Sequence, residues 1–122
     1  MDLKLEGKTA VVTGGSVGIG KAIALCLAQE GVDVAICARR KDVLDDTAAE
    51  IARATNRKIV PLVADLTKTE DANAFIEGAA EALGRIDILV NNAGAAAGGT
   101  LESLTDDDWE AALALKFFGY VR

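Results

Sequence analysis

The chain has 122 residues, of which 51% are hydrophobic and 26% charged, and its net charge is −6 at pH 7. This length fits one domain, and the balance of apolar and charged residues can build a core, which excludes an acidic disordered chain. The negative charge argues against a nucleic-acid-binding surface, and no apolar run is long enough for a membrane span. Histidine is absent, and with it the commonest zinc ligand, so we expect no metal site.

The N-terminal residues and the cysteines bear on location. Residues 1–8 alternate charged residues with leucine and contain no apolar signal-peptide core. Cys26 and Cys37 fall in a predicted helix and a predicted strand, and neither has a CxxC partner. Buried free thiols in a reducing compartment fit this pattern, and we therefore expect a cytoplasmic protein.

The first predicted strand leads into a glycine-rich turn and a helix. Residues 9–20 are TAVVTGGSVGIG. Gly14 can take the positive φ that a tight turn needs. Gly18 and Gly20 lack a Cβ, which lets a phosphate or a packed strand approach the first helical turn. The free N–H groups at this helix start predict a pyrophosphate site, and a turn that only connects strand to helix is the alternative.

Four strands alternate with four helices along the chain. The strands are expected over residues 8–13, 32–38, 58–64 and 86–90, and the helices over residues 18–30, 41–54, 67–83 and from 105 onward. This βαβαβαβα order predicts an α/β, Rossmann-like, doubly wound parallel sheet with strand order 3-2-1-4. The third strand would then be an edge strand, where Pro61 is tolerated.

Two arginines follow the second strand. A carboxylate at this position would accept hydrogen bonds from a ribose 2′-hydroxyl and favour NAD. Ala38 and Arg39 occupy it here, and the first acid, Asp42, lies inside the next helix. Because Arg39 and Arg40 can pair with a 2′-phosphate, the sequence favours NADP(H) over NAD(H). A solvated basic turn is the alternative.

The third and fourth strands also end in polar residues. Asp65 can accept the adenine amino group, or it can form a turn before Thr67. Thr67 is predicted to open the third helix, with Glu70 completing a capping box. Asn91-Asn92-Ala93-Gly94 follows the fourth strand, and its asparagines can alternatively bond their own backbone. Thr105 and the three aspartates after it predict the start of the last helix.

The strand ends together resemble the short-chain dehydrogenase/reductase family in its compact form. The residues that carry the resemblance are Thr13-Gly-x-x-x-Gly-x-Gly20, Asp65 and Asn91-Asn-Ala-Gly94, and the match runs from about residue 8 to the last residue. The resemblance implies an NAD(P)-dependent oxidoreductase that moves hydride between nicotinamide and a carbonyl or alcohol carbon. It implies these cofactor contacts: Gly14, Ser16, Gly18 and Ile19 around the pyrophosphate and ribose, Arg39 on the 2′-phosphate, Asp65 and Leu66 at the adenine, and Asn92, Ala93 and Gly94 beside the cofactor.

The catalytic residues of that family are not found in this sequence. The family uses a serine, and a tyrosine and lysine in a Tyr-x-x-x-Lys pattern. Tyr120 is the only tyrosine and Arg122 the last residue, so no such pattern exists here and we assign no catalytic residue. Lys116 stands where many members have an asparagine that supports the catalytic lysine through water. A lysine whose stem covers apolar surface is the alternative interpretation.

We therefore expect residues 1–122 to form a single NAD(P)-binding Rossmann domain, truncated at its C-terminal end. It would be the cofactor-binding part of an NADP(H)-dependent reductase for a small carbonyl or alcohol substrate, inactive alone and a homo-oligomer at full length. Two alternatives stay open. One is a non-catalytic NADP(H)-binding module, and the other is a structural fragment whose open fourth strand recruits another chain.

Overall fold

The computed structural model describes residues 1–122, in which strands and helices alternate as predicted. The elements are β1 (Thr9–Thr13), α1 (Gly18–Gln29), β2 (Asp33–Ala38), α2 (Lys41–Thr55), β3 (Ile59–Val63), α3 (Thr69–Leu83), β4 (Ile88–Val90), α4 (Asp106–Leu113), the π-helical turn η1 (Ala114–Phe118) and α5 (Gly119–Val121). The last three are continuous and form the single helix that the sequence predicts.

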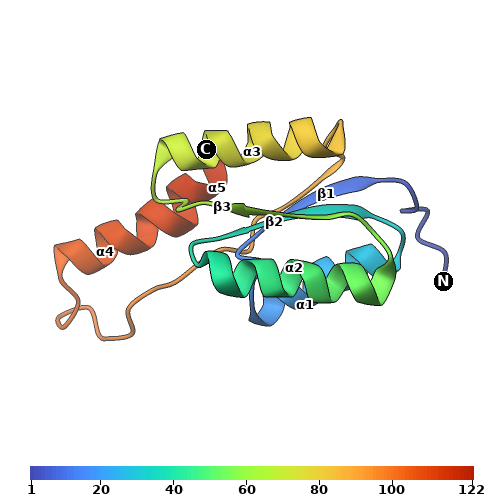
Figure 1. Cartoon of the computed structure of the whole chain (residues 1–122). Helices are drawn as coiled ribbons and strands as arrows, with labels where there is room; N and C mark the ends of the chain where they lie inside the picture. Colours follow the sequence, from blue (N-terminus) through green and yellow to red (C-terminus); the bar gives the residue numbers. More distant parts are fainter.

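The four strands form one parallel sheet in the order β3-β2-β1-β4, which confirms the predicted topology. Helices α1 and α2 cover one face of the sheet and α3 covers the other (Figure 1). β3 is an edge strand, and Pro61 is paired in register with Ile36 of β2. Proline has no N–H to donate to a further strand, so it fits an edge.

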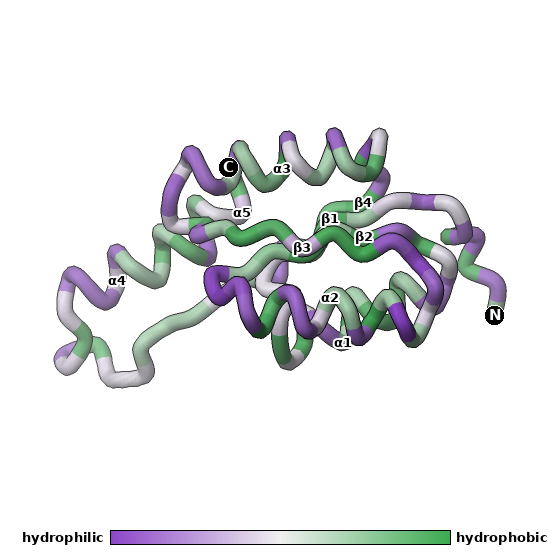
Figure 2. The backbone as a smooth tube through the Cα atoms, viewed as in Figure 1, coloured by the Kyte–Doolittle hydropathy of each residue, from purple (hydrophilic) through white to green (hydrophobic).

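The core lies on both faces of β1 and β2, because each face is covered by helices. Ala10, Val12 and Ile36 belong to a cluster with α1 and α2. Val11 and Cys37 pack in a second cluster with residues of α3. Figure 2 shows the strands as an apolar layer between the more polar outer turns of the helices. This buried sheet fixes where the strand ends lie.

The predicted capping box of Thr67 and Glu70 is wrong. α3 begins at Thr69, and its N-cap residue makes no side-chain cap hydrogen bond. The Thr67 hydroxyl instead donates to Asp65 Oδ1 at 2.6 Å, and the Thr67 N–H donates to the same oxygen at 3.0 Å. Because the Asp65 carboxylate lies only two residues away, it engages Thr67 in a turn and delays the helix start.

The fourth strand is shorter than predicted, since β4 begins at Ile88 rather than at residue 86. Residues before it attach to β1 partly through side chains. The Asp87 carboxylate accepts the Thr9 N–H at 2.9 Å, and the Thr9 hydroxyl donates to the Arg85 carbonyl at 2.6 Å. β4 is the second edge of the sheet, and Leu89 on it is 52% exposed.

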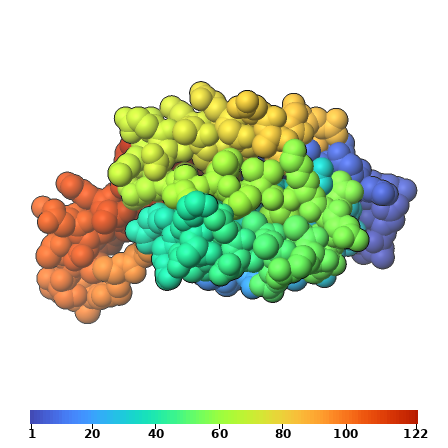
Figure 3. All heavy atoms as spheres, viewed as in Figure 1, coloured from blue at the N-terminus to red at the C-terminus, as the bar shows by residue number.

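The last helix starts where the sequence predicts, with a capping box at its N-terminus. The Asp108 N–H donates to Thr105 Oγ1 at 3.2 Å, and the Thr105 N–H donates to Asp108 Oδ2 at 2.9 Å. The loop before it and α4 project from the rest of the molecule (Figure 3). None of the helices combines the length and apolar composition that a membrane crossing requires.

Candidate functional site

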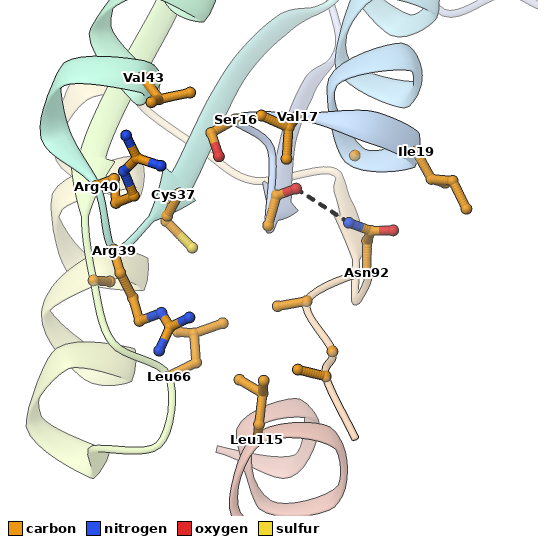
Figure 4. A pocket seen from close by; sticks show the side chains of 17 residues that line it. Ser16, Val17, Ile19, Cys37, Arg39, Arg40, Val43, Leu66, Asn92 and Leu115 are labelled. Carbon is orange, nitrogen blue, oxygen red and sulfur yellow. Dashed lines mark hydrogen bonds between the residues drawn. The ribbon is translucent and has the colours of Figure 1, made fainter. Parts of the chain in front are cut away.

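A cavity of about 480 Å³ lies at the carboxyl ends of the strands (Figure 4). Parallel strands all end at the same edge of a sheet, so four chain segments far apart in sequence meet there. Its lining residues are Gly14, Ser16, Val17, Ile19, Gly20, Cys37, Ala38, Arg39, Arg40, Val43, Ala64, Leu66, Asn92, Ala93, Gly94, Ala95 and Leu115. All of the predicted site residues except Gly18 and Asp65 are among them.

The glycine-rich turn is pressed against its neighbours on both sides. Gly14 has φ +67°, as the sequence predicts. A Cβ on Gly20 would lie 2.1 Å from the Gly14 carbonyl oxygen, and a Cβ on Gly15 would lie 2.7 Å from Ile36. The Gly15 N–H donates to the Cys37 carbonyl at 3.0 Å, which ties the turn to β2. The glycines therefore let the turn fold back tightly against α1 and β2.

Asn92 joins the turn to the end of β4. Its Nδ2 donates to the Thr13 carbonyl at 3.0 Å and to the Gly14 carbonyl at 3.2 Å. The Thr13 hydroxyl accepts the N–H groups of Asn92 and Ala93, both at 3.0 Å. The hypothesis that Asn92 bonds its own backbone is wrong, because the side chain bonds across to β1. The amide thus positions two walls of the cavity.

Two arginines stand at the other end of the cavity. Arg39 takes part in no ion pair or hydrogen bond, while Arg40 lies 3.6 Å from the Asp42 carboxylate with both side chains largely exposed. Figure 4 shows the Arg39 guanidinium beside Leu66 at the cavity wall. A cation that makes no salt bridge at a cavity wall can accept an anionic group without losing an existing partner.

Gly18 and Asp65 do not line the cavity. Gly18 has φ +58°, and open space surrounds the position where its Cβ would lie. The Asp65 carboxylate takes the turn-forming role that the sequence left open, since Oδ1 accepts both the hydroxyl and the N–H of Thr67. These hydrogen bonds lower the pKa of Asp65, with smaller contributions from the charges of Lys68 and Arg39. Asp65 Oδ2 accepts no hydrogen bond within the chain.

Comparison with known proteins identifies the family. The family model described as short chain dehydrogenase matches residues 8–122. The chain therefore belongs to the short-chain dehydrogenase/reductase family. This confirms the resemblance carried by the glycine-rich turn and by Asn91-Asn92-Ala93-Gly94.

This chain is similar in sequence and fold to individual members of the short-chain dehydrogenase/reductase family. The chain is 36% identical over 117 residues to the 3-oxoacyl-[acyl-carrier-protein] reductase FabG of Thermotoga maritima, covering 96% of this chain and 47% of FabG. It superposes on L-sorbose reductase from Gluconobacter frateurii, solved with NADPH and L-sorbose, with a TM-score of 0.95 and 34% identity, covering 99% of this chain and 46% of that one. A Burkholderia phymatum short-chain dehydrogenase/reductase solved with NAD gives a TM-score of 0.91 and 28% identity. The match covers 98% of this chain and 42% of that one. The chain thus spans less than half the length of these relatives.

Sequence reasoning missed the apolar walls of the cavity in this family member. Val43, Ala64 and Leu115 line it, and so does the Cys37 thiol. Burial raises the pKa of Cys37 to about 11, so this thiol stays protonated at neutral pH. Val43 lies one helical turn beyond Arg40, a spacing that could have indicated it. Leu115 comes from η1, and no local pattern in the sequence indicates that this helix reaches the cavity.

Proposed function

We propose that the cavity binds NADP(H) in preference to NAD(H), as the cofactor-binding part of an oxidoreductase for a small carbonyl or alcohol substrate. The observation that carries the proposal is the unpaired Arg39 guanidinium at the carboxyl end of β2, where a carboxylate would favour NAD. The similar structures include L-sorbose reductase solved with NADPH and the Burkholderia phymatum protein solved with NAD, so the preference for NADP(H) rests on Arg39. When bound, NADPH supplies the hydride.

The turn between β1 and α1 fits the phosphates of such a cofactor. The N–H groups of Ser16 and Val17 donate to no other residue of the chain, although both residues line the cavity. The first turn of α1 contains no acidic residue, so the positive end of the helix dipole is not neutralised. The free N–H groups of Ser16 and Val17 and the positive end of α1 would hold the phosphates. Gly14, Gly18 and Ile19 would lie beside the phosphates and the ribose.

The remaining walls fit the two ends of the cofactor. Leu66 offers an apolar surface for adenine in the cavity. Asp65 precedes Leu66 just outside the lining, and its Oδ2, which accepts no hydrogen bond within the chain, would accept the adenine amino group. Arg40 would assist Arg39 at the 2′-phosphate, because its contact with Asp42 is long and exposed. Asn92, Ala93 and Gly94 line the cavity beside the turn and would lie along the cofactor.

We further propose that the protein acts in the cytoplasm as a homo-oligomer. The two free thiols, Cys26 and Cys37, support the location, and the exposed aromatic side chains of the last helix support the association. Since Tyr120 is the only tyrosine, we expect the 122-residue chain to bind the cofactor without turning it over.

The cofactor preference is tested by titrating the chain with NADPH and NADH and following nucleotide fluorescence. Arg39→Asp should weaken NADPH binding by about tenfold or more, because a charge-assisted bond is replaced by repulsion. NADH binding should hold or improve, which reverses the preference. Arg53→Asp, in the last turn of α2, makes the same charge change away from the cavity and should alter neither affinity. An unchanged NADPH/NADH affinity ratio in Arg39→Asp would overturn the assignment.

A further inference from the structure

The hydroxyl of Thr47, on α2, makes a long-range contact that the local helix does not require. Thr47 is 4% exposed, and its Oγ1 donates to the Ser16 carbonyl at 2.6 Å. A threonine hydroxyl inside a helix usually bonds the carbonyl four residues earlier, which here is Val43. In this chain the hydroxyl instead reaches the glycine-rich turn, 31 residues away in sequence.

This hydrogen bond fixes the direction of one peptide group in the turn. The carbonyl of Ser16 and the N–H of Val17 belong to the same trans peptide unit and point in opposite directions. Because Thr47 holds the carbonyl on the α2 side, the Val17 N–H points away from α2. That N–H donates to no residue of the chain, and both Ser16 and Val17 line the cavity.

A second contact joins α2 to the first turns of α1. Lys21 Nζ of α1 lies 2.7 Å from Glu50 Oε2 of α2. Glu50 is three residues after Thr47 and Lys21 is five residues after Ser16, so the two contacts lie close together along both segments. The same helix α2 also begins directly after Arg39 and Arg40. α2 is therefore the element that joins the turn to the arginine end of the cavity.

We propose that Thr47 is a positioning residue for nucleotide binding, which acts by orienting the Ser16–Val17 peptide; the inference rests on the proposed function. Without the hydroxyl, the Ser16 carbonyl would face a buried apolar group with no donor. It would gain a partner only by rotating toward water in the cavity. There it would place a carbonyl oxygen, rather than an N–H, against a phosphate.

Three variants test this role. Thr47→Val removes the hydroxyl at nearly constant volume, and Thr47→Ser keeps it. Thr55→Val is the matched control, because Thr55 lies on the same helix and its Oγ1 donates only to the Ile51 carbonyl, at 2.8 Å. Two readouts are measured beside the melting temperature. One is the NADPH dissociation constant, and the other is hydrogen exchange of the Gly15 amide in the nucleotide-free chain.

Thr47→Val should raise the NADPH dissociation constant about fivefold and speed exchange of the Gly15 amide, because one hydrogen bond that orders the turn is lost. Thr47→Ser should restore both values. Thr55→Val should lower the melting temperature and leave both values unchanged. The proposal is overturned if Thr47→Val changes only the melting temperature, as a merely structural residue would. A wild-type chain that binds no NADPH counts against the proposed function, while the exchange rates still decide the role of Thr47 in the turn.

Discussion

At Gly20 the absence of a side chain is set by the molecule itself rather than by a ligand. A Cβ there would lie 2.1 Å from the Gly14 carbonyl oxygen and 2.6 Å from Asn92 Nδ2. Both atoms belong to the hydrogen-bond network that joins β1, the glycine-rich turn and the end of β4. The sequence predicts that a glycine is needed here, and the structure shows that the close neighbour is backbone.

Gly20→Ala should therefore lower the free energy of unfolding by at least about 2 kcal/mol, since the clash is with backbone that cannot move aside cheaply. Gly78→Ala is the matched control, also inside a helix. A Cβ on Gly78 would meet only Leu62 at 3.4 Å, an ordinary contact. Gly78→Ala should raise the free energy of unfolding by up to about 1 kcal/mol, because alanine has the higher helix propensity. Urea unfolding of both variants tests this difference. Equal changes in the free energy of unfolding would contradict the packing described for the turn.

Of the two thiols, Cys37 should react more slowly with alkylating reagents. Its pKa is raised to about 11 by burial, from an ordinary value of 9.0, whereas Cys26 is exposed. Two pKa units reduce the thiolate fraction near neutral pH about 100-fold. Iodoacetamide at pH 8 should modify Cys26 first and leave Cys37 almost untouched, as mass spectrometry of peptides would show. Equal labelling of both thiols in the folded chain would contradict the buried placement.

The same shift has a consequence for stability at high pH. The folded chain disfavours the Cys37 thiolate, whereas the unfolded chain does not. The protonated Cys37 thiol therefore contributes fully to the free energy of unfolding below pH 9. This contribution is lost as the pH rises from about 9 toward 11. Cys37→Ser should weaken this fall in the free energy of unfolding. Cys26→Ser should leave it unchanged.

Residue-level roles were predicted in part. The positive φ of Gly14 and the place of Arg39 at the cavity follow from local chemistry and strand order. The sequence left open whether Asp65 forms a turn with Thr67 or contacts adenine. It did not indicate the acceptors of Asn92, because Thr13 and Gly14 lie 79 and 78 residues away. Thr47 gave no signal at all, since its partner is 31 residues away.

Among the elements, the last helix carries the most exposed large hydrophobic residues. Trp109, Leu113, Phe117 and Phe118 are each between 45% and 57% exposed. The rings of Phe117 and Phe118 pack edge to face on each other at 5.2 Å rather than in a core. Exposed aromatic residues grouped on one helix are typical of an interaction surface.

We expect the chain to self-associate through this helix. Replacing Trp109 and Phe117 together by lysine should shift the chain toward monomer in light scattering, because charge is costly in an apolar interface. Leu101→Lys is the control, since Leu101 is 79% exposed but lies in the preceding loop. A wild-type chain that is already a monodisperse monomer at high concentration would contradict this expectation.

Element order and topology were predictable because two independent signals agree. Alternating strand and helix patterns require a parallel sheet, and Pro61 places the third strand at an edge. Element ends were less predictable. α3 starts two residues after Thr67 because of the Asp65 turn, and β4 starts at Ile88 beside the Asp87 contacts. The π-helical turn over residues 114–118 has no signal in the periodicity.

Across the whole molecule, one arrangement accounts for the cavity. A parallel sheet brings the glycine-rich turn, the two arginines, Leu66 and Asn92 to a single edge. Hydrogen bonds from Asn92 and Thr47 then fix the turn from two sides. The arrangement is that of a nucleotide-binding half of the short-chain dehydrogenase/reductase family, and the chain spans less than half of the relatives it matches.

We propose that this cavity binds NADP(H). A titration of the nitrogen-15-labelled chain with NADPH, followed by amide chemical shifts, tests it most directly. We predict saturable shifts that are largest for residues 14–19, for Arg39 and for residues 92–94, with little change in the amides of α3. Shifts that do not saturate, or that are largest for residues of β4 and α5 instead, would contradict NADP(H) binding in this cavity.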